Sequence, residues 1–87
     1  MDIEFDETKD RANRAKRGVS LALGAVVLQR SIGEIADDRR DYGEIRMNAF
    51  GLVQDRLFAC TYTVRGEAVR IISVRRASRQ EQRLWLS

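Results

Sequence analysis

The sequence predicts an α+β fold in which two N-terminal helices pack on a four-stranded antiparallel sheet and a third helix closes the chain. Three observations support this fold: capping residues and helical spacing in the first third of the chain, alternation of apolar and polar residues over 44–75, and a second capping pattern after residue 77. With 87 residues the chain is long enough for one domain, which we place at residues 1–87.

The first third of the chain carries two helix signals. Asp6 is a good N-cap for a helix that runs to about Arg17, and Gly18 supplies the usual C-terminal stop. Ser20 can cap a second helix through Leu28. That second helix is apolar almost all round, so we expect it to be buried on two sides.

The middle of the chain changes from polar to alternating. Residues 29–43 are mostly polar and charged, which predicts a loop with room for a short strand around Ser31–Ile35. After this loop Ile45, Met47 and Ala49 alternate with polar residues, as in a strand with one buried face.

Turns and a capping box organise the last third. Gln54-Asp55 and Arg65-Gly66-Glu67 predict two turns, and Ser78 with Glu81 predicts the start of a helix that Leu84 and Trp85 attach to the core. The remaining predicted strands are Ile3–Phe5, Leu57–Val64 and Ala68–Arg75.

Composition points to a polyanion as partner. Fourteen of the sixteen basic residues are arginine, whose planar fork of donors suits phosphate oxygens, and the net charge is +3. From Phe58 onward six arginines stand against only Glu67 and Glu81. The chain has no histidine and one cysteine, which excludes a His/Cys zinc site, a Cys-His nucleophile pair and an internal disulfide.

No membrane span or cofactor is expected. The longest apolar run, Val19–Leu28, is too short to cross a bilayer, and the acidic start of the chain does not resemble a signal peptide. We therefore expect a cytoplasmic protein.

Five segments carry a family resemblance. They are Phe5–Lys9 with Asn13, Lys16–Ser20, Asp41–Arg46, Tyr62–Gly66 and Val69–Glu81. In this order and spacing they resemble the BrnT family of toxins from bacterial type II toxin–antitoxin pairs. At Lys16-Arg17-Gly18 the family usually reads Lys-His-Gly, so this chain lacks that imidazole.

The resemblance implies a RelE-like fold and an endoribonuclease that cuts messenger RNA and slows growth until an antitoxin binds it. It also implies the partner, a BrnA-like antitoxin that resembles a ribbon-helix-helix dimer and forms a hetero-oligomer with the toxin. In the family the antitoxin recognises operator DNA, so we expect this chain to reach DNA only through its partner.

Metal-free RNA cleavage needs a base, an acid and donors around the charged transition state. Arginine suits only the donor role because it stays protonated. We expect Arg70 and Arg75, supported by Arg46 and Arg65, to hold the scissile phosphate. Because successive strand residues face opposite ways, Arg70 and Arg75 can share a face only if the strand bulges or ends between them.

Proton transfer has two candidates, Glu44 as base and Lys16 as acid or base. Clustered arginines should lower the pKa of Glu44 and weaken it as a base, which favours Lys16. Without histidine, we expect turnover to be slow. The further RNA-binding candidates are Lys9, Arg17, Tyr42, Arg76 and Arg79, with Tyr42 available to stack on a base.

Other interpretations stay open. The arginines could form a solvated surface paired with Glu44, Asp41 and Glu67. The chain could also be a non-catalytic RNA-binding module, or a degenerate toxin that acts as an antitoxin-binding co-repressor, and the missing histidine favours this alternative. A DNA-binding regulator ranks lower because no helix-turn-helix pattern is present.

Overall fold

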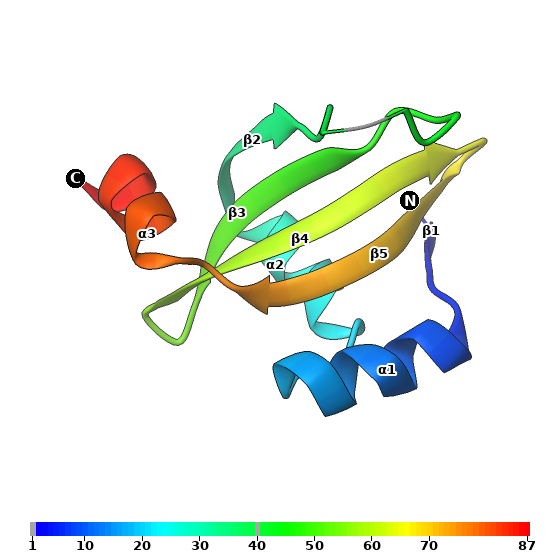
Figure 1. The fold of residues 1–87 in the computed structure, drawn as a ribbon, viewed down its shortest axis with the longest axis horizontal. Coiled ribbons are helices and arrows are strands. Elements are labelled where there is room, and N and C mark those ends of the chain that lie inside the picture. Colours follow the sequence, from blue (N-terminus) through cyan, green and yellow to red (C-terminus); the bar gives the residue numbers. More distant parts are fainter. Residues whose placement is uncertain (1, 40) are drawn as a thin grey trace.

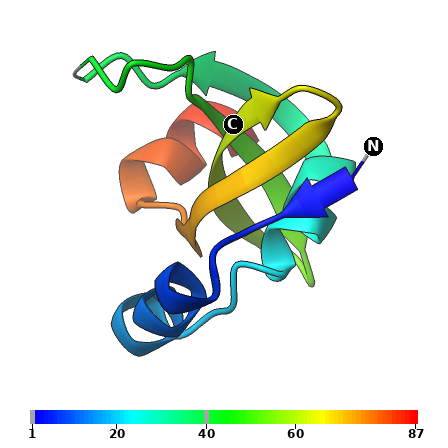
Figure 2. The same cartoon turned by 90° about the vertical axis from the view of Figure 1, so that its right-hand side faces the viewer.

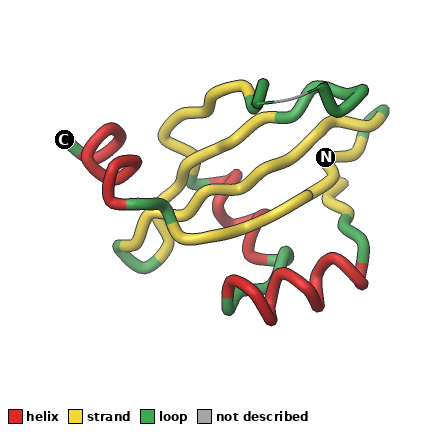
Figure 3. The backbone as a smooth tube through the Cα atoms, in the orientation of Figure 1, coloured by secondary structure: helices red, strands yellow, loops and turns green. Residues whose placement is uncertain are grey.

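A computed structural model describes residues 2–39 and 41–87 of the chain (Figure 1). The helices are α1 (Glu7–Arg17), α2 (Leu23–Gln29) and α3 (Arg79–Leu86). The strands are β1 (Asp2–Glu4), β2 (Ser31–Ala36), β3 (Met47–Val53), β4 (Arg56–Arg65) and β5 (Ala68–Arg76). Figure 3 shows the strands as one twisted sheet with the helices outside it. None of the helices within 2–39 and 41–87 has the length and apolar character that a membrane crossing requires.

The sheet is mixed and has five strands in the order β1-β5-β4-β3-β2. The α+β class is confirmed, but the prediction of four antiparallel strands is wrong in both number and direction. The short strand considered around Ser31–Ile35 forms and pairs antiparallel with β3. Strand β1 pairs parallel with β5, and Ile3 lies opposite Val69. This direction was not predictable, because the alternation of residues within one strand does not depend on the direction of the neighbouring strand.

The main core lies between α2 and one face of the sheet. Leu21 and Val27 pack with Phe58, Cys60 and Ile71, all of them buried. A Cβ atom at Gly51 would lie 2.4 Å from the carbonyl oxygen of Val27, so the helix lies close to the sheet backbone at that point. Within α2 only Gly24 and Val27 are buried, so the helix packs on the sheet with one side and is not buried on two sides as expected. It begins at Leu23 with no side-chain cap, and the hydroxyl of Ser20, the predicted cap, donates to Asp10.

Helix α1 lies along the free edge of β5 and is held by polar side chains. Its capping agrees with the sequence, since Asp6 accepts from the Lys9 amide and Gly18 has a left-handed φ of 79°. Asn13 is buried and pairs with both backbone groups of Val74, donating to the carbonyl oxygen and accepting from the amide. Two helices packed side by side on one face were expected, but α1 has no apolar stripe wide enough for such packing.

Helix α3 packs on the opposite face of the sheet from α2, as Figure 2 shows. The Ser78–Glu81 capping box is present, and the Trp85 ring stacks on Phe50 with centroids 5.0 Å apart. Trp85 is thus the predicted packing anchor. Leu84, expected to contact the core, is exposed because a helix of two turns presents only one side to the sheet.

The region before β3 also departs from the expected pattern. Ile45 was predicted to be buried with Met47 and Ala49, yet the strand begins at Met47 and the Ile45 side chain is 79% exposed. No helix covers the sheet next to Ile45. Apolar and polar residues therefore alternate in the sequence at this point although the apolar side chain is exposed. The turn at Gln54-Asp55 is confirmed by positive φ values of 51° and 64°.

Candidate active site

The face of the sheet opposite α2, which we call the open face, gathers the polar side chains of β3, β4 and β5. In β4, Phe58 and Cys60 point to the α2 core, whereas Leu57 and Ala59 pack on the α3 side. Alternation therefore places Thr61, Thr63 and Arg65 on the open face. Thr61 donates to Asn48 on β3 at 2.6 Å, which connects the two strands across this surface.

A β-bulge places Arg70 and Arg75 on the same face. Thr61 pairs with Ser73 and Tyr62 pairs with Ile71, so Ile72 is an extra residue in β5 without a partner in β4. The bulge shifts the alternation by one residue, and both arginines then project on the side of Thr63 and Ala59. The two arginines can share a face because the strand bulges between them, which is one of the two conditions expected from the sequence.

Arg75 is held rigidly by the start of α3. Its two terminal nitrogens donate to the two carboxylate oxygens of Glu81 at 2.7 and 2.9 Å, and one of them also donates to the Arg76 carbonyl oxygen. This paired hydrogen bond lowers the pKa of Glu81 to about 2 and raises the pKa of Arg75. Glu81 therefore both caps the helix and orients an arginine of the open face.

Glu44 connects two more of the predicted arginines. Its carboxylate oxygens accept from Arg46 at 3.0 Å and from Arg65 at 3.3 Å. The hydrogen bond from Arg46 is the main reason that the pKa of Glu44 is lowered, as the sequence predicted. The Arg46 guanidinium lies 4.0 Å from the ring centroid of Tyr42, and the Tyr42 hydroxyl donates to Asp37. Glu44, Arg46, Arg65 and Tyr42 thus form one cluster at the far end of the open face from α3.

Arg70 pairs with Glu4 on β1 at 3.3 Å, so each arginine predicted to be catalytic contacts a carboxylate. These pairs are not equivalent. The Arg70–Glu4 pair has a single long contact and a half-exposed carboxylate, and such pairs contribute about 1 kcal/mol or less. A phosphate can displace Glu4 more easily than it can displace the doubly bonded Glu81.

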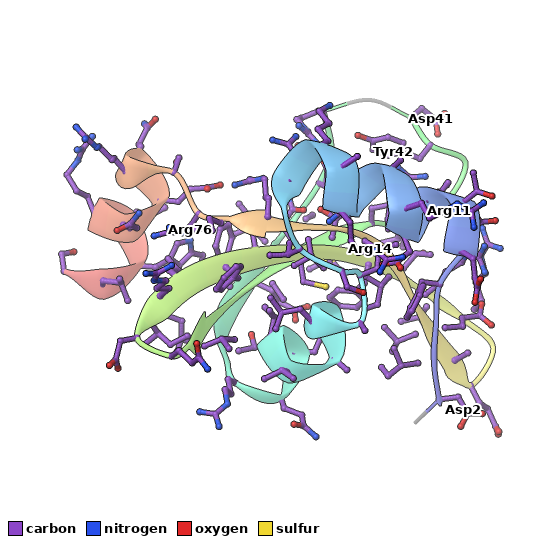
Figure 4. The ribbon with its side chains drawn as sticks, turned by 90° about the horizontal axis from the view of Figure 1, so that it is seen from below. Asp2, Arg11, Arg14, Asp41, Tyr42 and Arg76 are labelled. Carbon is purple, nitrogen blue, oxygen red and sulfur yellow. The ribbon has the colours of Figure 1, made fainter. Side chains whose placement is uncertain are left out.

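Asp37 and Arg39, which were not among the predicted site residues, belong to the same surface. Asp37 is buried and accepts two hydrogen bonds from Arg39, at 2.8 and 3.0 Å, and these lower the pKa of its carboxyl group. The positive charge of Arg39 is close enough to act on Arg75. Figure 4 shows Tyr42 and Asp41 on the side of the sheet away from α2, and Figure 2 shows their loop projecting on the side of α3. The only sequence signal for this contact was the charged run over 37–41.

Three of the five basic residues of α1 lie beside the open face, at the β5 edge. Lys9, Lys16 and Arg17 line a shallow pocket of about 240 Å³ together with Ser73. Within the described part of the chain, none of these three cations forms a salt bridge. Lys16 and Glu44 lie in different parts of this surface, because Lys16 lines a pocket with Ser73 of β5, whereas Glu44 contacts Arg46 and Arg65 at the far end from α3.

Two predicted RNA-binding residues lie apart from this group. Arg76 pairs with Phe58 and so lies on the α2 side at the end of β5. Arg79 is in the first turn of α3 and lines a groove with Gln82 and Arg83. Neither is brought to the cluster around Glu44, and their role in RNA binding stays a prediction.

The Arg75–Glu81 pair predicts a specific acid sensitivity. Because the folded-state pKa of Glu81 lies near 2, below the usual 4.5, its contribution is complete above about pH 4.5 and is lost as pH falls through 2. We expect Glu81→Gln to reduce the free energy of unfolding at pH 7, and the difference from the original protein to shrink as the pH approaches 2. Urea unfolding at pH 7, 4 and 2.5 measures this, with Glu67→Gln in the β4–β5 turn as control. A difference that stays constant across this range would contradict the prediction.

Other reactive groups do not extend the site. The single cysteine, Cys60, is buried in the core, which raises the pKa of its thiol to about 12. Among residues 2–39 and 41–87, no three His, Cys, Asp or Glu side chains come together as metal ligands would. The chemistry that this surface offers is therefore that of clustered guanidinium groups, carboxylates and the amines of α1.

Comparison with known protein families identifies the family of this chain. The family model described as a ribonuclease toxin, BrnT, of type II toxin–antitoxin systems matches residues 5–81. A search of curated proteins finds no match. The matched region contains all three arginines of β4 and β5 on the open face, together with Glu44 and Glu81. The chain therefore belongs to the BrnT family of type II toxin–antitoxin ribonuclease toxins.

Proposed function

We propose that this chain is an active endoribonuclease that cleaves RNA on the open face of its sheet, without a metal, and thereby inhibits translation and growth. The single observation that carries the proposal is the bulge at Ile72, which gives Arg70 and Arg75 a common face. A strand that only packs in a core has no need of this shift, whereas a phosphate site needs several donors on one side.

In the proposed reaction the ribose 2′-hydroxyl gives up its proton and its oxygen attacks the adjacent phosphorus. The bond to the 5′-oxygen breaks and that oxygen takes up a proton, which leaves a cyclic phosphate and a free 5′-hydroxyl with no net gain or loss of protons. Arg70 releases Glu4 to bind a non-bridging oxygen. Arg75 assists from its fixed position, since a guanidinium has five N–H donors and two suffice for Glu81. Donors that are fixed in advance stabilise the charge of the transition state without reorganising during the reaction.

Lys16 is the proposed proton-transfer residue. It lies at the edge of the open face beside Ser73, whereas Glu44 is occupied by two arginines that weaken it as a base. Lys9 and Arg17 extend the same edge and would bind flanking phosphates. Tyr42, whose ring is already stacked against Arg46, would position a base at the opposite end.

The proposed partner is a BrnA-like ribbon-helix-helix antitoxin in the cytoplasm, which silences the toxin and connects it to operator DNA. The family supports a type II antitoxin as partner. We expect the antitoxin to cover part of the open face or to displace a group on it.

The test is to incubate the purified chain with RNA, alone and with its antitoxin. Cleavage that yields 5′-hydroxyl ends, continues in EDTA and stops when the antitoxin is added supports the proposal. RNA that is retarded in a gel but stays intact over hours contradicts it.

A second candidate, a non-catalytic RNA-binding or co-repressor module, has two observations in its favour. Each predicted catalytic arginine is paired with a carboxylate, and the chain has no histidine for proton transfer. Retardation without cleavage, together with normal antitoxin binding, is the result that distinguishes this function.

A further inference from the structure

A hollow of about 480 Å³ lies at the end of the sheet that α2 does not reach. It is lined by Glu44, Ile45, Met47, Tyr62, Thr63, Val64 and Arg65, and we call it the hairpin pocket. Figure 1 shows β4 and β5 continuing beyond α2 toward their connecting turn. The pocket therefore lies on a part of the sheet that α2 does not cover.

The walls of the hairpin pocket are apolar and accessible. Ile45 is 79% exposed, the largest value among the large apolar side chains of the described residues, and Val64 is 57% exposed. Met47 lies opposite Tyr62 between them. Apolar side chains gathered around a hollow, rather than scattered singly, indicate a surface that binds a partner.

The rim of the pocket connects it to the open face. Glu44 and Arg65 line the pocket, and Glu44 also holds Arg46. A ligand carboxylate that pairs with the half-exposed Arg65 would compete with Glu44 and change the charge around Arg46. Occupation of the pocket therefore covers the Glu44 and Arg65 end of the open face and leaves Arg75, at the α3 end, uncovered.

We propose that the hairpin pocket is the docking site for an amphipathic segment of the antitoxin, with an apolar side chain held between Ile45 and Val64 and a carboxylate on Arg65. Two observations select this occupant. The chain belongs to a type II toxin family, whose members are paired with a protein antitoxin. Arg65 is also 55% exposed and is held by Glu44 through one contact of 3.3 Å, so an acidic partner group can pair with it.

RNA fits this pocket less well. A nucleic acid strand needs cations along its backbone and exposed aromatic rings for its bases. The one aromatic residue of the pocket, Tyr62, is half-buried and donates its hydroxyl to both oxygens of Glu34 at 2.8 and 2.9 Å. The pocket therefore favours a protein segment over a nucleic acid.

The test uses Ile45→Glu and Val64→Glu in the full chain, with Leu84→Glu as matched control. Leu84 is 70% exposed on α3, outside the pocket, so the control introduces the same charge on an equally accessible apolar residue. Binding to the purified product of the antitoxin reading frame paired with this gene is measured by calorimetry. Ile45 lies outside the strands, so its replacement should not prevent folding, and circular dichroism checks this.

We expect the two pocket variants to bind the antitoxin at least 100-fold more weakly, while Leu84→Glu binds as the original protein does. Protection from hydrogen exchange in the complex should extend over residues 62–65. Unchanged antitoxin affinity in both pocket variants would overturn the proposal. Pocket variants that bind RNA more weakly but bind the antitoxin normally would also overturn it, as would a Leu84→Glu protein that loses as much antitoxin affinity as they do. Although the regulatory consequence rests on the proposed nuclease function, this binding measurement does not require cleavage, so the two proposals can fail separately.

Discussion

Replacing Arg75 by alanine should lower kcat/KM for RNA cleavage by about 100- to 1000-fold, the range measured when one fixed donor to a charged transition state is removed. Arg75 is only one-third exposed and is held at both terminal nitrogens by Glu81. Its position is therefore set before substrate binds. Arg75→Lys should recover only a small part of the activity, because an ammonium group cannot bridge Glu81 and a phosphate in the same plane.

Two further variants separate chemistry from folding. Arg56→Ala removes an exposed arginine at the start of β4, on the α2 side of the sheet, and should cleave RNA at the original rate. Arg75→Ala leaves the Glu81 carboxylate without its partner. The double variant Arg75→Ala with Glu81→Gln tests whether that unpaired negative charge, rather than the missing guanidinium, causes the loss of RNA cleavage. An Arg75→Ala protein that cleaves RNA as fast as Arg56→Ala would remove Arg75 from the mechanism.

Asn13→Ala should destabilise the protein by about 3 kcal/mol, because buried backbone groups that lose their partners cost about 1–3 kcal/mol each. The Asn13 amide donates to the carbonyl oxygens of Val19 and Val74, both at 2.9 Å, and accepts from the Val74 amide at 3.3 Å. Since β1 covers only residues 68–70 of β5, Val74 depends on this side chain for pairing along that edge.

Thermal and urea unfolding measure the effect, and a loss of about 3 kcal/mol corresponds to a fall in Tm of roughly 10–20 °C for a domain of this size. Arg14→Ala is the control on the same helix, since Arg14 itself is more than half exposed in its salt bridge with Asp10 and should contribute about 1 kcal/mol or less. The buried Asp10 keeps its hydrogen bonds from Ser20 and the Leu21 amide in this variant. If Asn13→Ala unfolds within about 0.5 kcal/mol of Arg14→Ala, then α1 is held in place by other contacts. The change should also displace Lys16, which lies three residues further along the same helix.

The sequence predicted the features that depend on neighbouring residues. The N-cap at Asp6, the stop at Gly18 and the Ser78–Glu81 capping box are all present, since each is formed within one turn of helix. The Gln54-Asp55 turn is present for the same reason.

Features that depend on distant residues were not predictable in the same way. The parallel pairing of β1 joins residues 66 positions apart, and Glu4 becomes a partner of Arg70 only through that pairing. The prediction that Ile45 is buried was wrong, because an alternating pattern does not reveal where the helix that covers the sheet ends. Strand alternation required that β5 bulge or end between Arg70 and Arg75 if both were to share a face, but it could not decide between these or locate the bulge at Ile72.

The paired carboxylates also separate the candidate site into a stable and a labile part. From the sequence, Arg70 and Arg75 were expected to hold the phosphate with Arg46 and Arg65 in support, and nothing separated Arg70 from Arg75. Arg75 is fixed by two short hydrogen bonds, whereas Arg65 and Arg70 each have one contact of 3.3 Å. Distances of this kind depend on the folded backbone, so residue type alone could not rank these side chains.

The unpaired residue in β5 has a consequence for anyone who compares or engineers related chains. Before position 72 the even-numbered side chain Arg70 faces RNA in the proposed function, and after it the odd-numbered side chains Ser73 and Arg75 do so. A relative that is one residue shorter at this point would keep every arginine in its sequence, yet each side chain in the second half of the strand would project from the opposite face of the sheet. Alignments of these toxins should therefore be judged by the length of the segment between the two arginines as well as by the arginines themselves.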